Sequence, residues 1–209
     1  MNKSSPPSNL PINYSKITYH HPMNLILIGP QGSGKGTQAD LIVEKYHLKH
    51  IEAGELIRTQ AQKHNQKSEI IDHLVNKKGQ LLPDGIVLDM IIDRLENTGY
   101  HNLLFDGFPR TLTQYQALKE LLQDHQSPLD LALYLDIPIE ESVKRLLERG
   151  RGDDQPDIIH QRLEAFHQTT QPVVDQLQTD GLLARIDGNQ PVETVFTAIQ
   201  SALAALHTT

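Results

Sequence analysis

A glycine-rich stretch near the N-terminus carries the residue types that bind phosphate. It reads Gly29-Pro30-Gln31-Gly32-Ser33-Gly34-Lys35-Gly36-Thr37 and follows an apolar run directly. Glycines allow a tight turn whose backbone N–H groups point inward, and a following helix offers its positive N-terminus to an anion. Lys35 adds a point charge for the β- and γ-phosphates of a nucleotide. The stretch therefore predicts a nucleotide phosphate cradle, although a glycine-rich turn taken alone could be only a tight connection.

Two further charged features stand where an apolar or helical segment ends. Asp106 follows the apolar run 102–105, and a buried carboxylate there is costly without a partner. Capping the turn that follows is one structural role for it. The stretch ERGRGDD at 148–154 places Arg149 and Arg151 two positions apart, before two aspartates. Mixed charge between periodic segments is usually a solvated loop. Whether this stretch binds phosphate therefore depends on the motifs found elsewhere in the chain.

The elements that must position these residues alternate between strands and helices. Short apolar runs predict strands at 24–28, 49–51, 102–105, 131–135 and 182–186. Helix-length segments lie between or after them, at 36–46, 85–96, 113–124, 139–148, 157–178 and 192–206. This alternation predicts an α/β fold, a doubly wound parallel sheet of about five strands with right-handed crossovers. A ligand should then bind at the carboxyl ends of the strands.

Composition limits the classes of protein that remain. A chain of 209 residues suits one sizeable domain, and its net charge of −7 argues against a nucleic-acid-coating protein. The absence of Cys excludes disulfides and thiolate metal sites, and the eleven His residues show no HExxH pattern. Residues 1–22 are rich in Ser, Pro and Asn, which predicts a flexible extension. No run of 18 apolar residues occurs, so we expect no membrane span and a cytoplasmic protein.

The variant GKGT at 34–37 indicates a resemblance to a known family. GPQGSGKGTQA resembles the phosphate loop of adenylate kinases and the related nucleoside monophosphate kinases. Three further motifs match in the same order: IEAGELIR at 51–58, FDGFPRT at 105–111 with Gln114 after it, and 150–154 followed by Arg162. The resemblance covers the chain from about Asn24 onward. It implies a P-loop kinase domain over 23–209, with a helical monophosphate-binding insertion at about 53–82 and a very short lid at about 149–156.

The resemblance also implies an activity and a role for each matching residue. The activity would be reversible, Mg²⁺-dependent phosphoryl transfer from ATP to AMP by a monomer, without a covalent nucleophile. The catalytic residues would be Lys35, Arg110, Arg151 and Arg162. ATP would contact Gly32, Ser33, Gly34, Lys35, Gly36, Thr37, Arg149 and Asn189, with Arg149 over the base. The monophosphate would contact Ala53, Gly54, Arg58, Gln80, Leu82, Gly107, Arg110, Gln114, Arg151 and Arg162. Asp106 would hold Mg²⁺ through water.

Departures from the family pattern leave the acceptor open. Many adenylate kinases carry Thr where this chain has Ala53, and Ala is common in uridylate and cytidylate kinases. Gln114, by contrast, is the adenylate-kinase choice for reading a purine edge. The lid is shortened between Arg149 and Arg151, which limits the reach of Arg149 and predicts less complete exclusion of water. The alternatives are therefore a UMP or CMP kinase and, from another class, a nucleotide-binding protein without turnover.

Overall fold

The computed structural model describes residues 22–63, 65–76, 81–150 and 155–206. Its centre is a five-stranded sheet in which every pairing is parallel and the strand order is β2-β3-β1-β4-β5. The strands are β1 (Asn24–Ile28), β2 (Lys49–Glu52), β3 (Leu103–Asp106), β4 (Leu131–Asp136) and β5 (Leu183–Asp187). The predicted doubly wound α/β sheet is confirmed, with β2, β3, β4 and β5 each ending one residue later than expected.

Helices connect the strands and cover both faces of the sheet. They are α1 (Lys35–Tyr46), α2 (Ala53–Ala61), α3 (Gln66–Ile71), α4 (Asp84–Thr98), α5 (Leu112–Asp124), α6 (Ile139–Arg149), α7 (Pro156–Ala165), α8 (Gln171–Thr179) and α9 (Val192–Ala205). Two π-helical segments, η2 (Asp72–Asn76) and η3 (Phe166–Thr170), continue α3 and α7. Within the described ranges, no helix is both long and apolar enough to cross a bilayer.

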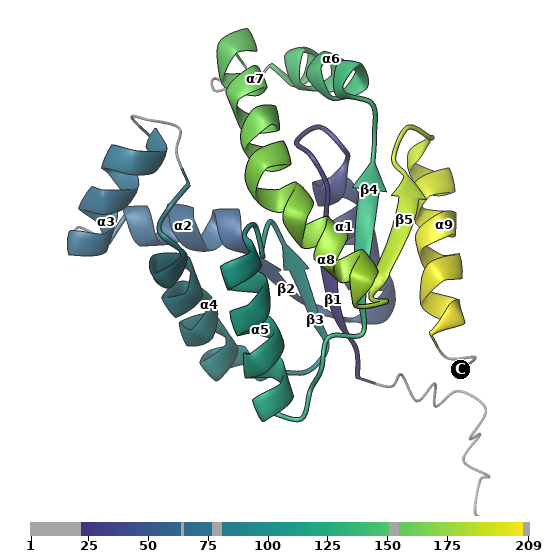
Figure 1. Ribbon diagram of the computed structural model, residues 1–209, viewed down its shortest axis with the longest axis horizontal. Coiled ribbons are helices and arrows are strands. Elements are labelled where there is room, and N and C mark those ends of the chain that lie inside the picture. Colours follow the sequence, from purple (N-terminus) through teal and green to yellow (C-terminus); the bar gives the residue numbers. More distant parts are fainter. Residues whose placement is uncertain (1–21, 64, 77–80, 151–154, 207–209) are drawn as a thin grey trace, which may run out of the picture.

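The two faces of the sheet bury separate cores because side chains alternate along each strand. All five residues of β1 are buried. Leu25 and Leu27 pack with α1 and α9 on one face. Ile26 and Ile28 pack with α4, α5 and α8 on the other face. Figure 1 shows the same layers, with α4, α5 and α8 in front of the sheet and α1 behind it. A central strand buried on both faces fixes the phosphate loop that follows it.

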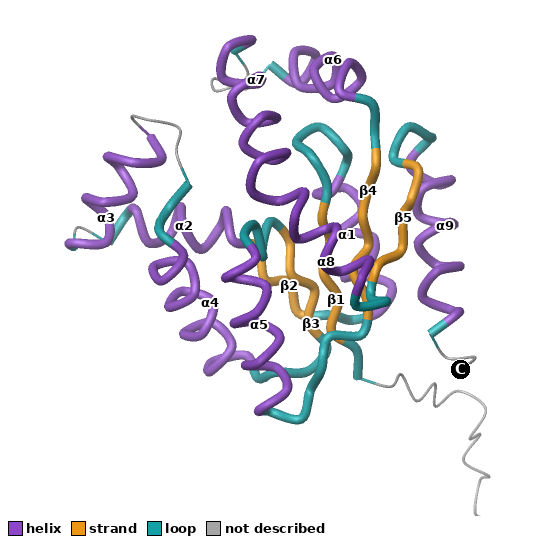
Figure 2. Tube along the Cα trace, viewed as in Figure 1, coloured by secondary structure: helices purple, strands orange, loops and turns teal. Residues whose placement is uncertain are grey.

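The carboxyl ends of the strands meet at one edge of the sheet. Figure 2 shows loops leaving the ends of β1, β3, β4 and β5 at this edge. The helices α2 and α3 lie on one side of it, and α6 and the start of α7 lie on the other (Figure 1). The described helices of the predicted monophosphate-binding segment, and the helices that flank the predicted lid, therefore lie on either side of the edge where the sheet predicts a ligand.

One helix differs from its sequence-based prediction. The expected helix 157–178 is α7, η3 and α8 in succession. Pro172 lies in the first turn of α8, and a proline ring inside a helix clashes with the carbonyl one turn earlier and removes a hydrogen bond. The wider π turn relieves this conflict: the N–H of Gln171 bonds to the carbonyl of Phe166 instead. The chain stays helical, so α7 is continuous with α8 on the sheet.

Candidate functional site

The phosphate loop has the predicted context, since it joins buried β1 to the start of α1. Gly32 and Gly34 both have positive φ, of 82° and 90°. A Cβ on Gly32 would lie 2.8 Å from the Ser142 carbonyl oxygen, whereas one on Gly34 would meet open space. The buried Ser33 Oγ has no hydrogen-bond partner among the described residues. A loop that packs against α6 on one side and leaves a free hydroxyl and open space on the other fits a bound phosphate chain.

Lys35 is the first residue of α1, and its side chain turns back to the start of this loop. Its Nζ donates hydrogen bonds to the carbonyl oxygens of Gly29 at 2.8 Å and Pro30 at 2.9 Å. Desolvation lowers the pKa of Lys35 to about 8, the Asp106 carboxylate opposes this shift, and the charges of Arg110 and Arg149 add to it. Such an effect requires proximity. The structure therefore brings together four of the predicted residues from α1, β3, the loop after β3 and α6.

Asp106 ends β3 and is 8% exposed. It does not cap the following helix, because Thr111 does so: its Oγ1 accepts from the N–H of Gln114 at 3.2 Å. The Asp106 carboxylate lies 3.7 Å from His50 Nε2 on β2, and it raises the pKa of His50 while burial lowers it. Among the described residues, no group of three or more acidic or His side chains could hold a metal ion. A carboxylate oxygen suits Mg²⁺, which prefers to keep water and phosphate as its other ligands.

Arg110 is held by three contacts on the loop after β3. Its Nε donates to the Gly107 carbonyl at 2.9 Å, and its backbone N–H donates to Gln114 Oε1 at 2.8 Å. Its carbonyl accepts from Thr170 Oγ1 of η3 at 3.2 Å. Desolvation lowers the pKa of Arg110, Asp106 opposes this, and the nearby Arg162 lowers it further. Arg162 on α7 thus reaches the same site, and the π turn is tied to the backbone of Arg110.

The predicted acceptor residues lie on the β2 side of this edge. Ala53 and Leu82 are buried, at 3% and 5% exposure, in the core beneath α4 and α5. Arg58 on α2 forms a surface salt bridge with Glu52 at 2.9 Å. Such a salt bridge is the ordinary structural role of a single surface arginine. Gln114 on α5 is 3% exposed, and its Nε2 donates to Asp84 Oδ1 at 2.9 Å. Sequence reasoning missed Asp84 as a partner of this glutamine.

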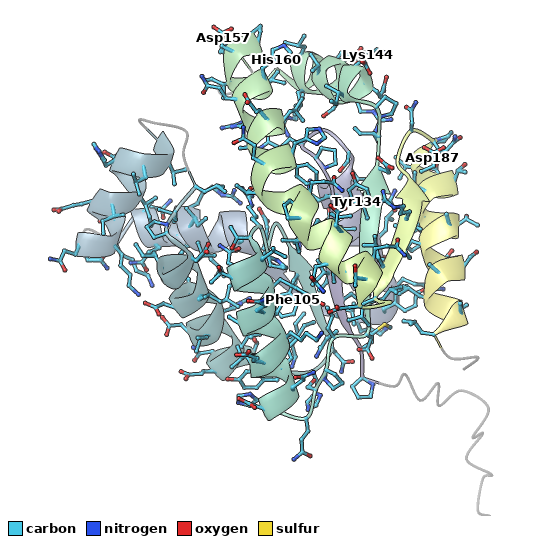
Figure 3. The ribbon with its side chains drawn as sticks, in the orientation of Figure 1. Phe105, Tyr134, Lys144, Asp157, His160 and Asp187 are labelled. Carbon is cyan, nitrogen blue, oxygen red and sulfur yellow. The ribbon has the colours of Figure 1, made fainter. Side chains whose placement is uncertain are left out.

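Arg145 on α6 is a second residue that the sequence analysis did not single out. Its Nη1 donates to the Gly188 carbonyl at 3.1 Å and contacts that of Gly32 at 3.5 Å, and its Nη2 donates to Asn189 Oδ1 at 3.3 Å. The Asn189 N–H bonds in turn to Asp187, which ends β5 and is labelled in Figure 3. Arg145 therefore joins the phosphate loop to the loop after β5. The sequence feature that could have identified Arg145 as a site residue is its position one helical turn before Arg149.

Some predicted residues lie outside the part of the chain that the structure describes. These are Gln80, Arg151 and the two lid aspartates, Asp153 and Asp154. Arg149, at the end of α6, is described and lies near enough to Lys35 for its charge to lower the pKa of that lysine. The candidate site within the described residues thus consists of the phosphate loop, Asp106, Arg110, Arg149 and Arg162, with Gln114 on the acceptor side.

Comparisons with known proteins find sequence relatives over most of this chain. Residues 27–182 match the family model for adenylate kinase. An adenylate kinase of Prochlorococcus marinus (strain MIT 9211) is 40% identical over 86% of this chain and 96% of its own length. One from Leptospira biflexa serovar Patoc is 39% identical over 86% of this chain and 98% of its own length. One from Parabacteroides distasonis is 36% identical over 87% and 97%.

Proposed function

The chain belongs to the adenylate kinase family, and we propose that it transfers the γ-phosphoryl group of ATP to AMP, giving two ADP. The observation that carries this proposal is the convergence of Lys35, Arg110 and Arg162 with Asp106 at the carboxyl edge of the sheet. Phosphoryl transfer requires mainly positioning and positive charge around the moving group. Lys35 and Arg110 lie near the Asp106 carboxylate and Arg162 lies near Arg110, so cations from three separate elements meet that requirement.

The donor would bind on the phosphate loop. Backbone N–H groups of 32–37 and the Lys35 ammonium would hold its phosphates. The Ser33 Oγ, which no described residue hydrogen-bonds, offers one more contact. Asn189 would also contact ATP, and Arg149 would lie over its base. Mg²⁺, with Asp106 holding it through water, would supply charge neutralisation to the phosphates of the donor. The buried position of Asp106 at the end of β3 supports this assignment.

The acceptor would bind on the β2 side. Arg110 and Arg58 would hold its phosphate, for which the planar guanidinium fork is suited. Gln114 would read the base, and Ala53, Gly54, Leu82 and Gly107 would line the pocket. Gln80 and Arg151 belong to the same proposal, although they lie outside the described residues. Arg58 would exchange its exposed pairing with Glu52 for the phosphate, a small cost because surface ion pairs contribute little.

The reaction itself needs no covalent intermediate. An oxygen of the AMP phosphate attacks the γ-phosphorus of ATP in line, the bond from that phosphorus to the bridging oxygen breaks, and ADP leaves. Lys35, Arg110 and Arg162 act by stabilising charge that spreads over the transferring group and the leaving oxygen. We also propose that the enzyme works as a monomer in the cytoplasm. Sedimentation analysis and cell fractionation would check these two points.

A panel of acceptors tests the proposed substrate. We expect kcat/KM, measured with MgATP, to be highest for AMP and lower for UMP and CMP. Replacing Gln114 by Ala should reduce this preference, because a site that hydrogen-bonds a base edge discriminates by what it leaves unpaired. Gln123→Ala, on an exposed position of the same helix, is the matched control. If AMP is the poorest acceptor, the proposed substrate is wrong. The protein is then a UMP or CMP kinase, a class in which Ala is common at the position of Ala53.

A further inference from the structure

Asp84 opens α4 and faces the start of α5. Its Oδ1 accepts from Gln114 Nε2 at 2.9 Å, and its Oδ2 accepts from Thr111 Oγ1 at 3.0 Å. Thr111 is also the residue that caps α5. Both carboxylate oxygens are therefore used, and both hold the same turn of α5. Asp84 thus joins α4 to α5 through a contact with Gln114, which lies 30 residues further along the chain.

The two partners of Gln114 fix the orientation of its amide. An ionised carboxylate only accepts hydrogen bonds, so the amide nitrogen must face Asp84. A backbone N–H only donates, so the amide oxygen must face Arg110, whose N–H lies 2.8 Å from Oε1. Reversing the amide would place donor against donor and acceptor against acceptor. Because Gln114 is 3% exposed, water cannot easily repair those mismatches.

We infer that Asp84 is a positioning residue that sets acceptor-base specificity by holding the Gln114 amide in one orientation. This inference rests on the proposed reading of the acceptor base by Gln114. With one N–H given to Asp84 and one lone pair to Arg110, the amide keeps one N–H and one lone pair for a ligand. Adenine offers an amino donor beside a ring acceptor, which matches that remaining pair. Guanine offers the reverse order, a carbonyl acceptor beside a ring N–H.

Three substitutions at Asp84 separate positioning from mere support of the fold. Asp84→Leu keeps the branched shape and removes both acceptors. Asp84→Asn keeps one oxygen for Gln114, while its Nδ2 can donate to Thr111 Oγ1, so it should rescue specificity. Asp84→Ser, whose hydroxyl is too short to reach Gln114, replaces the Leu variant if that variant does not fold. Asp89→Leu is the control, since Asp89 lies on the same helix, is exposed and pairs with Lys67.

The measurement is kcat/KM for AMP and for GMP in each variant, together with KM for ATP. We expect Asp84→Leu to lower kcat/KM for AMP and the AMP-to-GMP ratio by about tenfold, the value of one well-placed hydrogen bond. KM for ATP should not change. Asp84→Asn and Asp89→Leu should resemble the parent enzyme. In a Gln114→Ala background, Asp84→Leu should cause no further loss for AMP, because the amide that it positions is gone.

The possible results are distinct. An equal loss for AMP and GMP, or an effect that persists in the Gln114→Ala background, overturns the role of Asp84 and leaves the proposed function standing. A parent enzyme that prefers UMP or CMP to AMP overturns the proposed function itself. A loss of specificity in Asp84→Asn equal to that in Asp84→Leu would also contradict the inference, because the asparagine keeps the acceptor that Gln114 needs.

Discussion

The backbone N–H of Arg110 donates a hydrogen bond of 2.8 Å to Oε1 of Gln114. The residue proposed to hold the acceptor phosphate is thus joined to the residue proposed to read the acceptor base, and the donor is the backbone of Arg110 rather than its side chain. Removing the arginine side chain leaves it in place. The two parts of acceptor recognition can therefore be separated by mutation.

Arg110→Ala should weaken phosphate binding without changing base preference. We expect AMP affinity to fall by about 100-fold, since charged hydrogen bonds to phosphate are lost, while ATP affinity changes little. The ranking of AMP, UMP and CMP should stay the same. Calorimetry with each nucleotide separately makes the comparison, and Arg94→Ala on an exposed position of α4 is the control. Equal losses for ATP and AMP would show that Arg110 is misassigned.

The pKa of Lys35 predicts a pH dependence for donor binding. Because its folded pKa is lowered to about 8, the amine is charged below that pH and neutral above it. ATP affinity should decline as pH rises through about 8. Near that pH, binding should take up protons, since bound phosphate restores the charged form. Calorimetry in two buffers of different ionisation enthalpy measures the uptake, and Lys35→Met should abolish it. A flat profile from pH 7 to pH 9 in the parent enzyme would contradict this.

The elements could be predicted from the sequence because each has a local signal. The run Asn24–Ile28 is apolar throughout, and the glycines and Lys35 follow it at a fixed spacing. The π turn η3 could not be predicted, because a widened turn leaves the apolar pattern of a helix unbroken. Pro172 is the local feature that indicates a disturbance of the helix at this point.

The contacts that orient the site were also beyond local patterns. Asp84 meets Gln114 only because α4 and α5 lie side by side, and His50 meets Asp106 only through the pairing of β2 with β3. In the sequence, Arg145 has the pattern of an ordinary helix-surface arginine, because its contacts depend on the packing of α6 beside the phosphate loop. Single residues matching a motif were foreseeable, whereas the partners that hold them depend on long-range packing.

Arg145→Met should weaken the donor site selectively. Its side chain joins Gly32 of the phosphate loop to Gly188 and Asn189 after β5, so its loss should loosen both loops. We expect ATP affinity to fall by about tenfold, the value of one or two lost hydrogen bonds, with AMP affinity unchanged. Lys144→Met alters the neighbouring exposed residue of α6, labelled in Figure 3, and should have no effect. A fall in AMP affinity alone would contradict the assignment.

Asp180 should contribute to stability in an acid-sensitive way. Hydrogen bonds from Lys119, Tyr115 and Gln176, at 2.6, 2.6 and 2.7 Å, lower the pKa of Asp180 from 3.8 to about 2. Its stabilisation is therefore present above pH 3.8 and lost as pH falls toward about 2.

Asp180→Asn tests this contribution. The substitution should lower the free energy of unfolding by about 1–3 kcal/mol at pH 7 and by less at pH 2. Denaturant unfolding at both pH values measures the difference. Asp175→Asn on α8, the helix that ends just before Asp180, is the matched control, because its carboxylate accepts a hydrogen bond from the side chain of Gln171 one turn away. An equal effect of Asp180→Asn at both pH values would argue against the charged form as the source of stability.

The most direct measurement is the stoichiometry of the reaction with purified protein, MgATP and AMP, followed by separation of the nucleotides. We predict that, beyond any hydrolysis of ATP measured without AMP, ATP and AMP disappear at equal rates while ADP appears at twice that rate, and that ADP alone regenerates both. Lys35→Met should reduce the rate by at least about 100-fold, since it removes charge from the transition state. Conversion of ATP to ADP and inorganic phosphate as the sole reaction, with no AMP consumed, would contradict the proposed function.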